Sequence, residues 1–326
     1  MKDTLAAGLL PGEPVPTLPR WSLRPRRARR RIAAAGAGIL VWLFAGVPTA
    51  AAQGCPGPCP APDDARFDSR RHLLALGVNM ALGGLSAGIR RTHHEESFRD
   101  AFWRGALGGA GTYAGKAVAA SRFTGAGVIG RSVAAAGASV SRNASEGLPI
   151  FDRLSIPLGP VRVHWRPGKG DVHASVDVVT VGVIVGAYVS GIGASLDVGR
   201  TLDSGAPVFL ARRWQGDWGW QARQIGGVVF LRGDEPADIA HDAFMARALG
   251  HERVHVLQHD QVHIVWNEAA ERSVLTWLGA PPRLIRSVDF SLYMPIMLGL
   301  NALLPYETRP WERESHLLAG THRDAR

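Results

Sequence analysis

Four histidines at intervals of four residues form the stretch of this chain with the clearest capacity for chemistry. The segment GHERVHVLQHDQVH, residues 250–263, contains His251, His255, His259 and His263. In an α-helix the first two rings project from one face, about 6 Å apart along the axis. Two imidazoles at that separation can share one Zn²⁺ through bonds of about 2.0–2.1 Å.

A carboxylate follows the first histidine directly, which completes the pattern His-Glu-x-x-His. Glu252 lies to the side of the metal face, where it can take a proton from a zinc-bound water. We therefore predict that His251 and His255 bind zinc and that Glu252 is the catalytic base. A helical wheel places Arg253 and Asp260 opposite the two histidines. We expect the metal face to point inward and these two charges to point outward.

The other two histidines lie farther along the same helix. His259 is about 12 Å from His251 along the axis, so one ion cannot readily be held by both. For His259 and His263 three roles stay open: they orient the ligands, they line a cleft, or they lie on the ordinary helix surface, which is the favoured interpretation. Glutamines at positions 258 and 261 exclude the metzincin pattern, which has glycine and histidine there.

A third protein ligand must come from another part of the chain. Glu312 in the segment RPWERES is the preferred choice, because it begins a later helix that can pack antiparallel to the histidine helix. Glu314 is the reserve. Glu268 and Glu271 remain alternatives, although a continuous helix would hold Glu268 about 20 Å from the second histidine. His316 follows one turn after Glu312 and could steady a developing oxyanion. A solvent-facing histidine is the alternative.

The two segments together resemble the gluzincin branch of zinc metallopeptidases. HERVHVLQ followed by RPWERES is similar to small bacterial proteins with a His-Glu-x-x-His-x-x-Gln helix and a later Glu-x-x-Ala helix. The resemblance covers about residues 245–318, with serine in place of the usual alanine. It implies His251, His255 and Glu312 as Zn²⁺ ligands and Glu252 as general base. It also implies a substrate-binding edge strand, for which GGVVFLRG is the nearest match.

The elements that must position these residues predict an α+β fold in three sections. Residues 72–147 carry glycine, alanine and serine at spacings of three and four, which is typical of closely packed helices. Residues 148–235 predict a β-rich, antiparallel section with a hairpin at RPGKGD and further strands in the uncharged run VVTVGVIVGAYVSGIGASL. Residues 236–326 predict a helical section that holds the metal site.

Two helix starts can be read in this last section. Asp238 is a suitable N-cap for one long helix, or two abutting helices, from Ile239 to the segment GAPPR. Pro310, followed by acidic residues, marks the start of the later helix that carries Glu312.

The first 52 residues are typical of an export signal. RPRRARRR precedes the 16-residue apolar stretch 32–47, and TAAAQ offers a cleavage site after about Ala52. An uncleaved anchor is the alternative, but the stretch is shorter than the roughly 20 residues that span a bilayer. Residues 53–71 contain both cysteines and predict a Pro/Gly linker. We therefore expect an exported protein, periplasmic or associated with the cell envelope.

The charge of the chain does not indicate nucleic-acid binding. Of the net charge of +9, residues 1–52 supply +6, through eight basic and two acidic residues. Two function classes remain. The favoured one is an exported zinc metallopeptidase that acts on a peptide or protein. The alternative is a non-catalytic cell-envelope structural or membrane-associated protein, with a structural zinc or a degenerate motif. Association of the Gly/Ala-rich section with a membrane surface is a further expectation, against a simple packed helical core.

Overall fold

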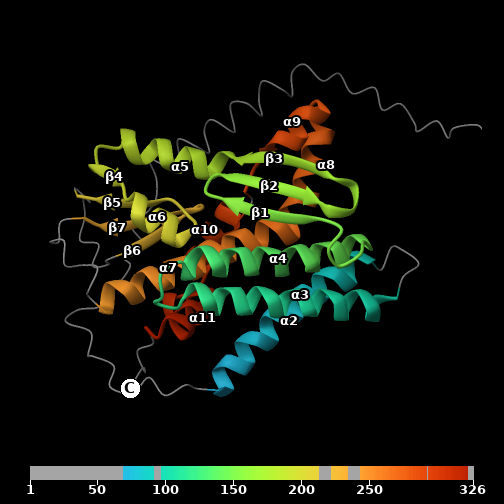
Figure 1. The fold of residues 1–326 in the computed structure, drawn as a ribbon, viewed down its shortest axis with the longest axis horizontal. Helices are drawn as coiled ribbons and strands as arrows, with labels where there is room; N and C mark the ends of the chain where they lie inside the picture. The colour runs from blue at the N-terminus through green and yellow to red at the C-terminus, as the bar shows by residue number, and fades with distance from the viewer. Residues whose placement is uncertain (1–68, 92–96, 213–221, 234–242, 292, 322–326) are drawn as a thin grey trace, which may run out of the picture. The chain divides into compact units, whose positions relative to one another are not determined.

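The computed structural model describes residues 69–91, 97–212, 222–233, 243–291 and 293–321, and these confirm a mixed α+β fold (Figure 1). Three long helices come first, two four-stranded sheets follow, and helices close the described part. The expected export signal, most of the expected linker, and the expected N-cap at Asp238 lie outside the described residues.

The first three helices form the Gly/Ala-rich section. They are α2 Ser69–Arg91, α3 Phe98–Ala119 and α4 Ala126–Glu146. The helices approach one another so closely that a Cβ added at Gly109 would lie 2.1 Å from the backbone oxygen of Asn79. The small residues therefore do what their spacing predicted and let α2, α3 and α4 pack backbone to backbone. Of the described helices, α2 alone is long and apolar enough to cross a membrane by length and composition, and one-third of its most apolar stretch is buried.

Sheet A contains the predicted hairpin. Its strands lie in the order β1-β2-β3-β8 and comprise β1 Leu154–Leu158, β2 Val161–Arg166, β3 Asp171–Asp177 and β8 Val288–Asp289. The turn between β2 and β3 is a short 3-10 helix, Pro167–Lys169, within RPGKGD. The polar face of β2 is the buried one, with Arg162 and His164 inside. Sheet A packs against α4 (Figure 1). The face of the sheet that α4 covers therefore carries buried charged side chains.

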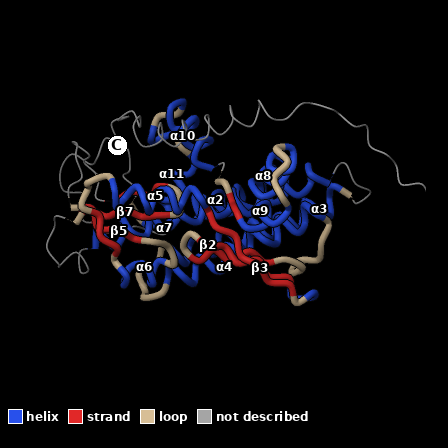
Figure 2. The backbone as a smooth tube through the Cα atoms, turned by 90° about the horizontal axis from the view of Figure 1, so that it is seen from above, coloured by secondary structure: helices blue, strands red, loops and turns tan. Residues whose placement is uncertain are grey.

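Sheet B lies beside sheet A as a separate group of strands (Figure 2). Its order is β4-β5-β7-β6, with β4 Ala194–Leu196, β5 Val208–Ala211, β6 Ala222–Ile225 and β7 Val228–Arg232. β5 and β7 run parallel and supply much of the apolar core. The segment GGVVFLRG thus forms β7, which is interior. The expectation of an edge strand there is wrong, because β6 pairs on its outer side.

The uncharged run after β3 is mostly helical, which corrects the expectation of strands. Val178–Val189 forms α5, and only Ala194–Leu196 at the end of the run is a strand. Asp177 causes the difference, because its carboxylate accepts hydrogen bonds from the backbone N–H groups of Val179 and Thr180 and caps the helix. The capped turn overrides the β propensity of the valines. A short helix, α6 Val198–Ser204, follows β4.

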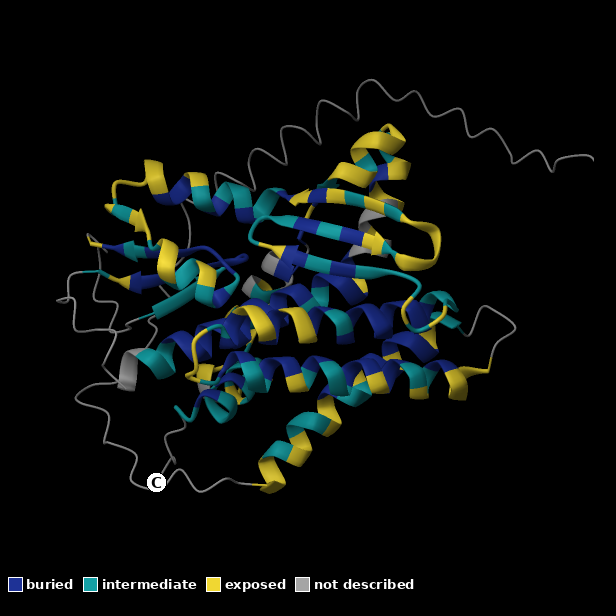
Figure 3. Cartoon of the chain, in the orientation of Figure 1, coloured by how far each residue is buried: buried dark blue, intermediate teal, exposed yellow. Residues whose placement is uncertain are grey.

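The last section is built around one central helix. α7 Ala243–Val262 continues through a π-helical turn, His263–Asn267, into α8 Glu268–Trp277, which confirms two abutting helices. Residues 249–260 are buried throughout (Figure 3), because α3, α4, α11, β6 and β7 all contact α7. The chain then forms α9 Pro282–Ser287, α10 Tyr293–Leu303, a 3-10 turn Tyr306–Thr308, and α11 Pro310–Ala319. Pro310 opens α11, as predicted.

Candidate metal centre

The segments that sequence reasoning paired, α7 and α11, pack against each other and bring three polar atoms together. Nε2 of His255 lies 3.0 Å from Nε2 of His251 and 3.1 Å from Oε2 of Glu312. Nε2 of His251 lies 3.3 Å from the same carboxylate oxygen. Ligand atoms of a tetrahedral zinc with bonds of about 2.0–2.1 Å are about 3.3 Å apart. The separations are those of three ligands on one ion.

The triangle combines donor types that a divalent ion accepts. His251 and His255 would supply two imidazole nitrogens and Glu312 one carboxylate oxygen. The donor set of two imidazoles and one carboxylate is one that zinc accepts in catalytic sites. The residues therefore fit a divalent metal.

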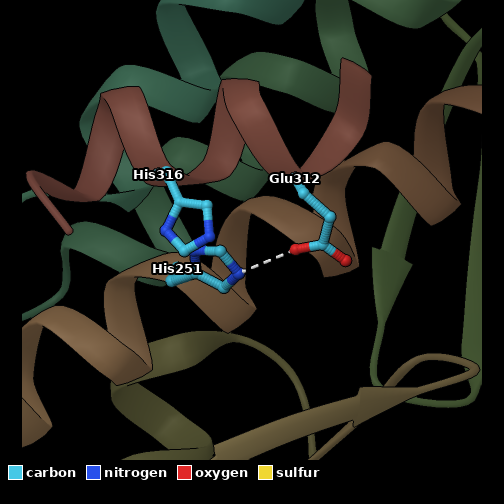
Figure 4. Close-up of side chains that lie close together, drawn as sticks. All are labelled: His251, Glu312 and His316. Atoms are coloured by element: carbon cyan, nitrogen blue, oxygen red, sulfur yellow. Dashed lines mark ion pairs between the residues drawn. The ribbon is translucent and has the colours of Figure 1, made fainter. Parts of the chain in front are cut away.

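His316 is the fourth polar side chain at the site. Ligand atoms of His251, Glu312 and His316 lie within 4.8 Å of one another, so this trio could also hold a metal ion. Figure 4 shows the ring of His316 against that of His251, with Glu312 on the other side; the ring centroids are 4.5 Å apart. Nε2 of His316 is 3.1 Å from Oη of Tyr306, and Nδ1 is 2.7 Å from Oγ1 of Thr321. We favour His255 over His316 as a ligand, because Nε2 of His255 lies 3.0 Å from His251 and 3.1 Å from Glu312, the separations of ligands on one ion.

Glu252, the predicted general base, interacts electrostatically with all three residues of the triangle. The side chain is buried, and its carboxylate accepts a hydrogen bond from the backbone N–H of Gln224 in β6. Burial raises the pKa of Glu252 above its ordinary value, although His251 and His255 act in the opposite direction. A carboxylate with a raised pKa accepts a proton more readily than an ordinary one, as general base catalysis near neutral pH requires.

His255 and Glu312 carry compensating charges. Burial disfavours the charged form of His255, but Glu312 reverses this and raises the pKa of His255 to about 9. Burial likewise disfavours the charged Glu312, and His255 and His251 reverse it, so the pKa of Glu312 lies far below its usual range. A proton on His255 thus occupies the place of a cation, and an ion bound by Nε2 would have to displace it.

Of the other predicted ligands, the one whose side chain is described does not point at the triangle. Glu314, the reserve choice, faces the Gly-rich helices and forms a 2.9 Å ion pair with Lys116 of α3. Glu268 and Glu271 belong to α8, beyond the π-helical turn, and their side chains lie outside the described residues. Glu312 is the one acidic side chain of α11 that reaches the two histidines in the described part of the chain.

The expectation that the far side of α7 faces solvent is wrong. Arg253 and Asp260 are 4% and 3% exposed. Arg253 pairs with Asp203, and Asp260 pairs with Arg131 of α4 at 2.7 Å. A helical wheel assumes one open face, whereas α7 is surrounded, so its charges are balanced by neighbours instead of water. The sequence did contain a sign of this burial, because Arg131, a charged residue, lies within the Gly/Ala-rich helix α4.

His259 and His263 are not surface residues either, since each is 1% exposed. Nε2 of His259 is 2.9 Å from Oγ of Ser291, and Nε2 of His263 is 3.6 Å from Oδ2 of Asp289. Asp289 also pairs with Arg162 at 2.9 Å. This group of charges is a buried network below sheet A, separate from the triangle of metal-ligand atoms.

Sequence reasoning missed several contacts of the candidate ligands and of His316. Gln258 and Ser315 contact the ring of His255, and Tyr306 contacts His316. The motif His-Glu-x-x-His-x-x-Gln included the glutamine but assigned it no role, and Tyr306 lies in no motif.

The comparisons with known proteins do not add a family to this description. No protein-family model matches the chain, and neither a curated protein nor a solved structure matches it. The metal centre is therefore described from its own geometry.

Proposed function

We propose that the protein is a zinc-dependent hydrolase, and specifically a metallopeptidase, with His251, His255 and Glu312 as the zinc ligands. One observation carries the proposal: three ligand atoms from α7 and α11 lie 3.0–3.3 Å apart, with the buried carboxylate of Glu252 in the next position of α7. Zinc supplies Lewis-acid polarisation of a carbonyl and makes water acidic enough to react at neutral pH.

The side chains of this chain perform the proton transfers. Glu252 removes a proton from the attacking water and passes it to the departing amine. The N–H of Gln224 holds the carboxylate in place. His316 and Tyr306 form a hydrogen-bonded pair beside the proposed ligands; when Nε2 of His316 donates to Tyr306, the hydroxyl of Tyr306 can donate to the oxyanion. Burial, followed by Glu312 and Glu252, raises the pKa of Tyr306, so its hydroxyl keeps its proton.

The test measures zinc content and peptide hydrolysis on the same preparations. The wild-type protein should bind one zinc and cleave a fluorogenic peptide mixture. His255→Ala and Glu312→Ala should lose both zinc and activity, because each removes a ligand. Glu252→Gln should keep zinc and lose activity by about 10²-fold or more, since only the proton acceptor is removed. Full activity in Glu252→Gln would refute the assigned mechanism.

A structural zinc site is the second candidate, and the position of His316 favours it. If His316 closes the coordination sphere, four protein ligands leave no place for water, as is usual in structural sites. Its ligand atom is already within 4.8 Å of those of His251 and Glu312. His316→Ala distinguishes the two functions. Loss of zinc supports a structural site, and retained zinc with reduced hydrolysis supports catalysis.

Export and association with a membrane surface are part of the proposal. Arginine-rich residues precede the apolar stretch 32–47, which supports export. α2 exposes an apolar stripe at helical spacing, composed of Leu74, Val78, Leu82, Leu85 and Ile89. Arg70 and Arg71 are exposed at the start of the same helix. Apolar side chains flanked by positive charge suit the surface of an anionic lipid bilayer.

A further inference from the structure

The ring of His255 is held by a hydrogen bond at the nitrogen that faces away from the metal triangle. Nδ1 of His255 is 2.8 Å from Oε1 of Gln258, one helical turn on. An amide oxygen only accepts, so Nδ1 keeps its proton, and Nε2 is the nitrogen at which an ion would take the place of the proton shared with Glu312. The Gln258 amide therefore directs Nε2 of His255 to the triangle, and Oγ of Ser315, 3.4 Å from Nδ1, is a weaker second contact on the same nitrogen.

The amide of Gln258 is fixed in turn by α11. Its Nε2 donates to Oε2 of Glu314 at 2.8 Å and to the backbone oxygen of Trp311 at 3.1 Å. Both partners are acceptors, so a flipped amide would place an oxygen against two oxygens. Glu314 thus has a task that its neighbour Glu312 does not: it orients the amide that orients the ligand.

The Gly-rich helices hold Glu314 in its charged form. Lys116 of α3 donates to Oε2 of Glu314 at 2.9 Å, and Asn79 of α2 donates to Oε1 at 2.6 Å. Lys116 also donates to Oδ1 of Asn79 at 2.9 Å. Lys116 and Asn79 are each 2% exposed. Burial raises the pKa of Glu314, but Lys116, Gln258 and Asn79 reverse this and lower it.

Stability alone does not explain this cluster. A buried ion pair is often no more stabilising than apolar side chains of similar volume, because both charges lose their water. Here the lysine and the asparagine are buried in stretches of α3 and α2 that are rich in glycine and alanine. By contrast, Nδ1 of His251 has no hydrogen-bond partner among the described residues. The cluster therefore acts on one of the two histidines.

We infer that Gln258 and Glu314, supported by Lys116 and Asn79, are positioning residues for the metal centre. They hold His255 in the tautomer and orientation that bind the ion, in the way that groups behind a ligand raise metal affinity in other sites. The inference rests on the proposed metal site. It assigns the Gly-rich helices a function: α2 and α3 supply the charge and the amide that complete the support of His255.

The test is a titration of the metal-free full chain with Co²⁺, followed by visible absorption. Gln258→Met keeps the size of the side chain and removes the acceptor for Nδ1 of His255. Glu314→Gln keeps its shape and allows the Gln258 amide to flip. Both should weaken Co²⁺ binding by about 10–100-fold, and competition with Zn²⁺ should give the same ratio. The absorption bands should also change, because a rotated imidazole alters the coordination geometry.

Asp260→Asn is the matched control. It lies two residues after Gln258, is equally buried, and loses an ion pair with Arg131, but it has no contact with a proposed ligand. It should lower the unfolding temperature and leave Co²⁺ affinity within about threefold of the wild type. If Gln258→Met does not fold, Glu314→Gln decides the matter.

Four other results would each decide a claim. Unchanged Co²⁺ affinity in folded Gln258→Met and Glu314→Gln overturns the inference, and so does an equal loss in Asp260→Asn. A wild-type chain that binds neither metal overturns the inference together with the metal site. A wild-type chain that binds metal without hydrolysing peptides refutes the peptidase alone, since the affinity ratios still report on positioning.

Discussion

Replacing Gly109 by alanine tests how far the close crossing of α2 and α3 supports both the fold and the metal centre. An added Cβ would lie 2.1 Å from the backbone oxygen of Asn79, whereas ordinary contact begins at 3.4 Å. The two helices must therefore separate locally by about 1.3 Å, the difference between these distances. No flexible side chain can absorb the clash, because the contacting atoms belong to the backbone of α2.

The magnitude follows from comparison with Gly77→Ala in α2, where an added Cβ meets nothing within 4 Å. Alanine in place of glycine gains about 1 kcal/mol of helix propensity in both variants, so this gain cancels. The difference is the overpacking cost of about 1–3 kcal/mol. At about 2–4 °C per kcal/mol, Gly109→Ala should unfold about 2–12 °C below Gly77→Ala.

The assay is thermal unfolding followed by circular dichroism, with Co²⁺ titration as the second measurement. Separation of the helices moves Asn79 away from Glu314, so Gly109→Ala should also bind Co²⁺ more weakly than Gly77→Ala. Equal unfolding temperatures for the two variants would show that the crossing tolerates a methyl group, and the packing argument would then be wrong.

Three further predictions follow from the structure. Metal affinity should rise about tenfold per pH unit up to about pH 9, because binding displaces the proton of His255; Co²⁺ titrations from pH 6 to 10 measure this. In the metal-free protein the His255–Glu312 ion pair should stabilise the fold fully between the ordinary pKa values of 4.5 and 6.5, and this contribution should be lost as pH rises through about 9. Urea unfolding of the wild type and of Glu312→Gln across this range measures it. A difference in unfolding free energy that does not change with pH would show that the ion pair is unimportant. Leu74→Gln with Val78→Gln should reduce co-sedimentation with anionic vesicles, and unchanged sedimentation would remove α2 as the contact surface.

Most of the correct predictions rest on short, local sequence patterns. The four-residue spacing of His251 and His255 depends only on helix geometry, and Pro310 marks its helix start through its own backbone. The hairpin at RPGKGD follows from alternation and turn residues within one short segment. In each case the information lies within a few residues, so no knowledge of distant partners was needed.

Features that depend on residues far apart in the sequence could not be predicted from local patterns. Glu314 and Lys116 are 198 residues apart, and nothing near either residue specifies the other. The outward orientation expected for Arg253 and Asp260 failed because burial on every side of α7 is a property of the assembled fold. The valines of α5 gave a misleading propensity, and a single capping residue, Asp177, decided the conformation.

The distribution of the metal-site residues along the chain has a consequence for biosynthesis. Glu312 follows His255 by 57 residues, and Glu314 follows Asn79 by 235. A chain that emerges from the ribosome or a translocation channel N-terminus first exposes both histidines well before α11 appears. The proposed zinc site then lacks its carboxylate ligand and its positioning glutamate. The proposed hydrolase therefore stays inactive during synthesis and transport, and its activity begins only when α11 docks on α7.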